Sequence, residues 1–257
     1  MNMEDTSQVK TINRLVGVLD CFTQEDSAWS LAELAARLDL PKSTLHRFLV
    51  GLESNGILRR DAHDRKWRLG YRLFIWGSLA AESNGLRHIA RPIMHDLTGE
   101  TGETTLLTVY HDHEVICTEK VETTHHVRLS LEIGMRRPCH AGASSKALMA
   151  YLPEAEIDAI IREKGLPKLC INTITDPARL KAELNQVRAQ GYALSLEETD
   201  PGAWGVAAPI RDWRGEVVGA LGIAGPTQRY DPTRLQEYAL LCCQAADKVS
   251  ALLRAGL

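Results

Sequence analysis

The sequence has no long apolar run. Across its 257 residues, no stretch approaches the roughly 18 to 20 consecutive apolar residues that a membrane-spanning helix needs. Residues 1–10 are polar and lack the apolar segment of a signal peptide. We therefore expect a cytoplasmic protein with no membrane partner.

Paired cysteine motifs, internal repeats and low-complexity tracts are lacking as well. The six cysteines stand at positions 21, 117, 139, 170, 242 and 243, with no C-x-x-C pair and no regular framework. Because the cytoplasm keeps thiols reduced, we expect six free cysteines.

An overall basic charge is also missing, since the formal net charge is −3. The whole molecule is therefore not a basic nucleic-acid binder, and any DNA site must be a local patch. Such a patch exists: residues 40–72 hold eight basic and three acidic side chains, a local net charge of +5. The first 85 residues together are neutral, so the positive charge is concentrated.

This basic segment coincides with a helix-turn-helix pattern. Ser30 followed by Glu33 has the capping-box spacing and predicts the start of one helix. Pro41 suits the first turn of the next helix, and Asn55-Gly56 suits its end. A helix over 11–22 precedes them, and a hairpin with strands 57–60 and 66–69 follows.

Polar and basic side chains stand at the start of the third helix, opposite its apolar face. In a helix-turn-helix this part of the recognition helix enters the major groove, where hydroxyl and cationic groups contact bases and phosphates. We predict DNA contacts from the helix and from the basic hairpin at Lys42, Ser43, Thr44, His46, Arg47, Arg59, Arg60, Arg65 and Lys66. The alternative is a small helical domain with a solvated charged face.

The second half of the chain has a different pattern. We predict linking helices over 71–84 and 87–98, then strands over 104–110, 114–121, 126–131, 192–197, 206–211 and 216–223. Helices are predicted over 144–152, 154–164, 176–190 and 232–253. A sheet flanked by helices indicates an α+β domain.

Two distant motifs carry a family resemblance. The run from Leu31 to Leu58, LAELAARLDLPKSTLHRFLVGLESNGIL, resembles the winged helix-turn-helix of the isocitrate lyase regulator (IclR) family. The segment His-Ala-Gly-Ala-Ser-Ser-Lys-Ala-Leu at 140–148 and the run from Gly191 to Asp212 resemble that family's C-terminal signatures. The likeness extends from about Val9 to the C-terminus.

The resemblance implies a two-domain transcriptional regulator. Its parts would be a winged helix-turn-helix DNA-binding domain at 9–72, linker helices at 73–98, and a GAF-like effector-binding domain with a six-stranded antiparallel sheet at 99–257. It also implies a double-stranded DNA operator, a small-molecule effector, and assembly as a dimer or a dimer of dimers. It implies neither an enzyme nor a cofactor.

The resemblance also places an effector pocket. Backbone N–H groups of Ala143 and Ser144 would face an effector carboxylate, and the other implied pocket residues are Leu129, Leu131, Glu197, Glu198, Gly205, Gly222 and Ala224. Two departures stand out: Ser145 replaces the family's usual Gly, and Gly205 replaces a usual Cys, Ser or Ala. The missing side chain at 205 would enlarge the site. On the residues alone, the alternative is that Ser144 and Ser145 only cap the helix.

Three other chemistries have candidate residues in the sequence. The glycines between Gly219 and Gly225 lie in a predicted strand that ends in proline, which is the wrong context for a dinucleotide site. Cys139 beside His140 suggests a nucleophile, but neighbours on an extended chain point in opposite directions. The remaining metal-type side chains show no zinc-finger spacing: His111, His113, Cys117, His125 and His126. An enzyme or a metal protein with a vestigial helix-turn-helix therefore stays as the alternative.

Overall fold

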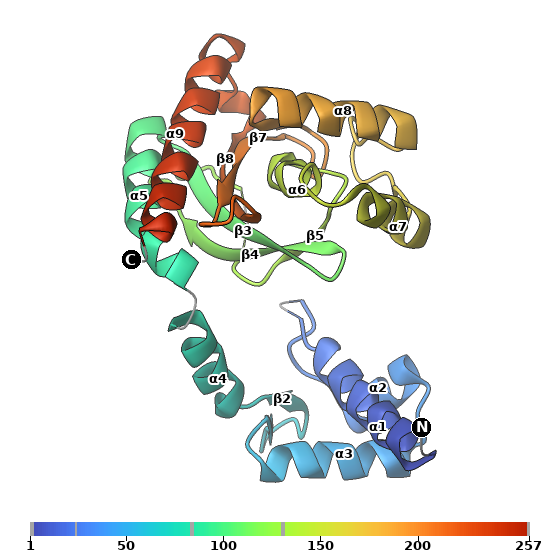
Figure 1. Cartoon of the computed structure of the whole chain (residues 1–257). Coiled ribbons are helices and arrows are strands. Elements are labelled where there is room, and N and C mark those ends of the chain that lie inside the picture. The colour runs from blue at the N-terminus through green and yellow to red at the C-terminus, as the bar shows by residue number, and fades with distance from the viewer. Residues whose placement is uncertain (1–2, 24, 83–84, 130–131, 256–257) are drawn as a thin grey trace. The chain divides into compact units, whose positions relative to one another are not determined.

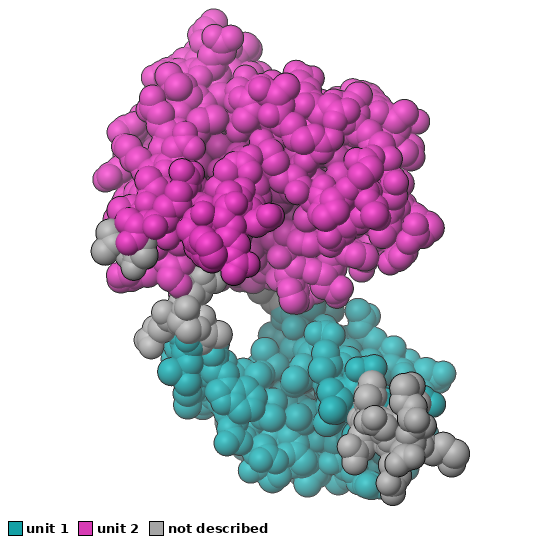
Figure 2. Space-filling model, in the orientation of Figure 1, with its two compact units in different colours: residues 1–83 teal, residues 84–257 magenta. Residues whose placement is uncertain are grey.

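The computed structural model describes residues 3–23, 25–82, 85–129 and 132–255. The chain divides into two compact units, residues 1–83 and 84–257 (Figure 2). This division assigns the first predicted linker helix to the N-terminal unit and the second to the C-terminal unit. Among the described residues, no helix combines the length and apolar character needed to cross a membrane.

The N-terminal unit is a helix-turn-helix with a two-stranded wing. It comprises α1 (Met3–Asp20), α2 (Leu31–Leu38), α3 (Lys42–Ser54), β1 (Leu58–Arg60), β2 (Trp67–Leu69) and α4 (Tyr71–Glu82). The first three helices, α1 to α3, meet the hairpin in one core around Leu34, Leu45 and Trp67, all 2% exposed or less. Trp67 also pairs through its backbone with Trp29, which attaches the wing to the segment before α2.

The C-terminal unit is an α+β domain built on one antiparallel sheet (Figure 1). Its strand order is β5-β4-β3-β8-β7-β6, which confirms the six antiparallel strands that the family resemblance implies. The strands are β3 (Thr104–His111), β4 (Glu114–Val121), β5 (Arg136–Pro138), β6 (Ala193–Leu196), β7 (Ala203–Arg211) and β8 (Val217–Pro226).

Helices cover both faces of this sheet. On one face α5 (Gly85–Thr101) packs with α9 (Leu235–Arg254), which follows a short turn of 3-10 helix at Pro232–Arg234. On the other lie α6 (Ala143–Met149), α7 (Glu154–Lys164) and α8 (Pro177–Gln190). Each layer closes a separate apolar core, so the sheet is buried on both sides.

One predicted strand is wrong. The described part of the segment predicted as a strand over 126–131 contains bends and no strand, and Val127 is 65% exposed. The alternation of apolar residues there resembles a strand, but a strand needs a partner edge. The free edge of β4 is taken by β5, which pairs Ile116 with Arg136 and Glu114 with Pro138.

Candidate functional site

The corner between α2 and α3 is built by local backbone chemistry. Ser30 Oγ accepts a hydrogen bond from the Glu33 N–H, and Glu33 Oε2 accepts one from the Ser30 N–H at 2.7 Å, which confirms the predicted capping box. The Ser30 backbone bond lowers the pKa of Glu33 to about 2. Asp39, in the left-handed region at φ 49°, then turns the chain toward α3.

The recognition helix α3 has one buried side and one polar side. Leu45, Leu49 and Leu52 are buried in the core of the unit. The opposite side exposes Lys42, Ser43, His46 and Arg47, and it half-exposes Thr44. All five predicted contact residues of this helix therefore reach solvent together at its N-terminal half.

The eight basic side chains of residues 40–72 fall into two groups. Within the described part of the chain, Lys42, Arg47, Arg59 and Arg65 make no recorded ion pair or hydrogen bond through their side chains. The others are engaged within the unit: Arg60, Lys66, Arg68 and Arg72. The order of residues in the chain does not reveal this distinction, because it depends on contacts made in the folded unit.

The engaged group stabilises the wing. Arg68 pairs with Asp64 at 2.8 Å and holds the hairpin loop, while Lys66 reaches Glu33 of the capping box at 3.2 Å. Arg60 lies over the Trp67 ring and donates to the backbone carbonyl of Arg65. Of the predicted DNA contacts, Arg60 and Lys66 thus already make side-chain contacts within the unit. Arg59 and Arg65 make no side-chain hydrogen bond or ion pair within the described part of the chain.

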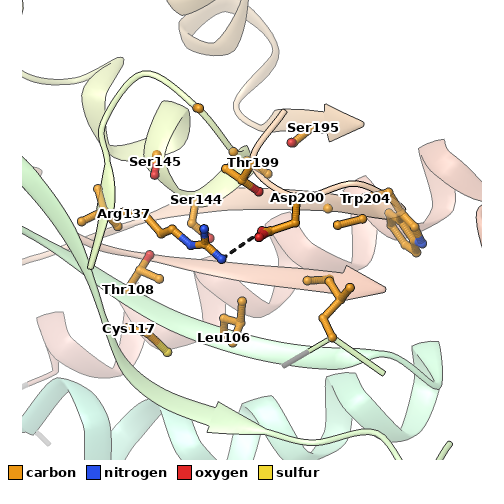
Figure 3. A pocket seen from close by; sticks show the side chains of 18 of the residues that line it. Leu106, Thr108, Cys117, Arg137, Ser144, Ser145, Ser195, Thr199, Asp200 and Trp204 are labelled. Atoms are coloured by element: carbon orange, nitrogen blue, oxygen red, sulfur yellow. Dashed lines mark hydrogen bonds and ion pairs between the residues drawn. The ribbon is translucent and has the colours of Figure 1, made fainter. Parts of the chain in front are cut away.

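A cleft opens in the C-terminal unit between the sheet and the start of α6 (Figure 3). Its empty volume is about 730 Å³, counting the part open to solvent. Much of the wall is apolar, with Leu106, Val115 and Ile223 among its members. Hydroxyl groups interrupt this wall at Thr108, Ser144, Ser145, Ser195 and Thr199.

Two charged residues line the cleft within the described part of the chain. Arg137, on β5, donates from Nη2 to Asp200 Oδ2 at 2.9 Å. Asp200 lies on the loop between β6 and β7. Figure 3 shows the Arg137 guanidinium extending over the cleft toward Asp200. Neither residue was predicted from the sequence, although Arg137 stands three positions before His140, where the second family motif begins.

The structure brings most of the predicted pocket residues together. Leu129, Ala143, Ser144, Gly205 and Ala224 line the cleft. A Cβ on Gly205 would lie 3.1 Å from the Ile223 carbonyl oxygen and 3.7 Å from the Ala143 Cβ, so glycine leaves this space open. Leu131 lies outside the described residues.

Three predicted residues lie outside the cleft lining. Gly222 is beneath it, where an added Cβ would lie 2.8 Å from Ser144 Oγ. Glu197 turns away in the left-handed region at φ 49° and accepts a hydrogen bond from the Gly202 N–H. Glu198 instead pairs with Lys146 at 2.6 Å. The chain reverses direction after β6, and this reversal directs both carboxylates elsewhere.

Cys139 does not have the environment of a nucleophile. It is 1% exposed, and burial raises the pKa of its thiol to about 12. The neighbouring His140 uses Nε2 to bond the Pro167 carbonyl oxygen at 3.0 Å, so it does not act on the thiol. Among the described residues, no group of three or more His, Cys, Asp or Glu side chains is placed to hold a metal ion.

Two family descriptions match the sequence, and together they span most of the chain. Residues 11–62 match the IclR helix-turn-helix domain, and residues 78–251 match the bacterial transcriptional regulator IclR C-terminal domain. The HTH-type transcriptional regulator BhcR of Paracoccus denitrificans is 34% identical over 250 residues, covering 97% of this chain and 89% of that protein. The transcriptional repressor IclR of Escherichia coli is 34% identical over 247 residues, covering 95% and 90%.

A solved structure agrees in fold over nearly the whole length. An IclR homologue from Microbacterium hydrocarbonoxydans, crystallised in complex with 4-hydroxybenzoate, superposes with a TM-score of 0.83 at 30% identity. The match covers 95% of this chain and 99% of the homologue. The sequence, the two-unit fold and the relatives' names therefore agree on one class of protein.

Proposed function

The chain belongs to the IclR family of DNA-binding transcriptional regulators. From that premise we propose that a small organic acid, bound in the cleft of the C-terminal unit, controls the affinity of the protein for a DNA operator. The operator would be double-stranded and would be contacted by α3 and the wing. Because operators lie on the chromosome, the protein would act in the cytoplasm. The relatives are named regulators and repressors, so the enzyme alternative is set aside.

One observation carries the DNA half of the proposal: Lys42, Arg47, Arg59 and Arg65 have no side-chain partner within the described part of the chain. Arginine and lysine side chains that are not neutralised by the protein can replace counterions along the phosphate backbone. Two of the four lie on the recognition helix and two on the wing. This arrangement supports base contacts from α3 and backbone contacts from the hairpin.

The cleft supports the part of the proposal that concerns the effector. Small-molecule sites are typically concave, mostly apolar and furnished with a few polar groups, and this cleft has that composition. The homologue crystallised with 4-hydroxybenzoate shares the fold, which makes a small aromatic acid a reasonable first ligand to test. A ligand would regulate DNA binding only if it bound DNA-competent and DNA-incompetent arrangements with unequal affinity.

The exposed face of α4 supports a homo-oligomer, either a dimer or a dimer of dimers. This helix exposes Tyr71, Phe74, Ile75, Trp76 and Leu79, each between 48% and 81% accessible. Apolar side chains gathered in this way mark an association surface rather than an ordinary solvated face. A second copy is the occupant we propose, because a two-fold pair of recognition helices would match two half-sites.

Electrophoretic mobility shift tests the proposal. We expect the purified protein to retard the DNA upstream of its own coding region at low salt. We also expect Arg47→Ala to abolish that shift while leaving acid-induced thermal stabilisation intact. Loss of both properties together in Arg47→Ala would contradict the division of roles between the units. No shift at low salt, combined with turnover of a carboxylate, would instead favour an enzyme.

A further inference from the structure

The charged pair at the cleft differs from the pair that Arg229 forms with Glu103 in the same unit. Arg229 donates hydrogen bonds to Glu103 from two nitrogens, Nε to Oε1 at 2.6 Å and Nη2 to Oε2 at 2.5 Å. The Glu103 side chain is only 4% exposed. That geometry saturates the carboxylate and is typical of a structural pair.

Arg137 makes fewer hydrogen bonds to its carboxylate partner than Arg229 does. One nitrogen, Nη2, donates to one oxygen of Asp200, and the side chains are 30% and 44% exposed. A guanidinium carries five N–H donors in a planar fork. Within the described part of the chain, no other hydrogen bond is recorded for the Arg137 side chain, so an edge of the fork remains open to a ligand.

The surroundings of Arg137 indicate what that ligand is. The cleft wall offers apolar contact from Leu106, Val115 and Ile223, and hydroxyl groups from Thr108 and Ser144. A carboxylate on the guanidinium fork, with a small apolar body against that wall, matches both parts of the cleft. A purely apolar ligand would leave the charged pair without a role.

We propose that Arg137 binds the carboxylate of the effector and that Asp200 competes with this carboxylate for the same guanidinium. The inference rests on the proposed effector site and names the group that selects its ligand. The Asp200 carboxylate occupies part of the fork that the ligand carboxylate would use. Two carboxylates beside one guanidinium repel each other, so Asp200 weakens acid binding and rejects acids that cannot displace it.

A different ligand class predicts the opposite behaviour of Asp200. A zwitterion would place its carboxylate on Arg137 and its ammonium group on Asp200, and it would then need both charges. A neutral ligand would need neither. The Asp200→Asn variant therefore separates the three classes: it tightens the binding of a simple acid, weakens the binding of a zwitterion and leaves a neutral ligand unaffected.

The test is ligand binding by the full-length protein, measured by thermal shift and calorimetry. The probes are benzoate, 4-hydroxybenzoate and 3-phenylpropanoate, their three amides, and L-phenylalanine. The variants are Arg137→Met and Asp200→Asn. The matched controls are Arg136→Met and Glu114→Gln, because Arg136 is the neighbour on β5 and pairs with Glu114 at 2.7 Å outside the cleft lining.

We expect an acid to bind the wild type more tightly than its amide does. Arg137→Met should lose at least about tenfold in affinity for that acid, the usual scale of a charge-assisted hydrogen bond. Asp200→Asn should gain several-fold, and the two control variants should match the wild type. The pattern of all four variants together is the signature of the competition.

Other outcomes overturn the inference in distinguishable ways. Equal binding of acid and amide, or full acid binding by Arg137→Met, would refute Arg137 as the carboxylate group while leaving an effector in the cleft. Weaker acid binding by Asp200→Asn would refute the competition, and preferential binding of L-phenylalanine would favour a zwitterion. If no acid bound the wild type, the acid class would be wrong, while mobility shift would still test the DNA half.

Discussion

Lys146 and Glu198 form a buried ion pair, with Lys146 Nζ 2.6 Å from Glu198 Oε1 and side-chain exposures of 1% and 8%. The other oxygen of Glu198 accepts a hydrogen bond from the Gly142 N–H at 3.0 Å. Lys146 also reaches Glu183 of α8 at 2.8 Å. The pair therefore joins the start of α6 to the loop that carries Asp200, and it does so behind the cleft rather than within it.

Removing the lysine should destabilise the C-terminal unit. Lys146→Ala leaves the Glu198 carboxylate buried without its counter-charge, a change that costs about 3 kcal/mol in comparable buried pairs. Urea unfolding of the full chain measures the loss. The matched control is Lys181→Ala, which breaks exposed pairs with Glu154 and Asp158 and should cost under about 1 kcal/mol. Equal losses in the two variants would contradict a special role for the buried pair.

The two groups of basic side chains in the N-terminal unit should behave differently toward DNA. Arg59→Ala removes a cation that has no partner within the described part of the chain, so operator affinity should fall and the salt dependence should lose about one counterion. Lys66→Ala removes a cation that is already paired with Glu33, so the effect should be smaller. Fluorescence anisotropy across a salt series gives both values. A larger effect for Lys66→Ala would reverse this assignment.

Bulk at the start of α6 should block the effector without harming DNA binding. Ser144 lines the cleft, and its hydroxyl lies 2.8 Å from the position that a Cβ on Gly222 would take, so no room exists behind it. Ser144→Phe must therefore project into the cleft. We expect loss of acid-induced thermal stabilisation with an unchanged mobility shift. An unaltered ligand response in this variant would count against the cleft as the effector site.

The buried His140 should make stability depend on pH. Burial lowers the pKa of His140, and its Nε2–H donates to the Pro167 carbonyl oxygen. Because the unfolded chain keeps an ordinary histidine pKa of about 6.5, it binds the proton more readily than the native state does. Stability should therefore fall as pH falls through about 6.5, and should level off below the native pKa.

Urea midpoints at several pH values between neutral and mildly acidic conditions measure this effect. His140→Gln should flatten the pH dependence. The matched control variant is His46→Gln, at an exposed position. Identical slopes in the wild type and His140→Gln would show that other groups set the acid sensitivity.

Local signals explain what could be predicted from the sequence. The capping box at Ser30 and the leucine spacing of α3 act within a few residues of the chain, so their structural outcome followed from the pattern. The α8 start at Asp176-Pro177 and its end at Gly191 are similar cases. The predicted strand over 126–131 is a different case, because a strand forms only where a neighbouring edge is free, and the described part of this segment forms none.

Residues close together in the chain specify the helix-turn-helix, the concentration of positive charge and the alternation of strands and helices, so these features could be predicted from the sequence. Which cations are paired depends instead on the folded arrangement: Arg59 and Arg68 are opposite each other in the wing, and Arg68 is neutralised by Asp64. It also brought Arg137 and Asp200, 63 residues apart, to one cleft. Ion pairs and cleft walls depend on distances across the fold, and the order of residues does not specify those distances.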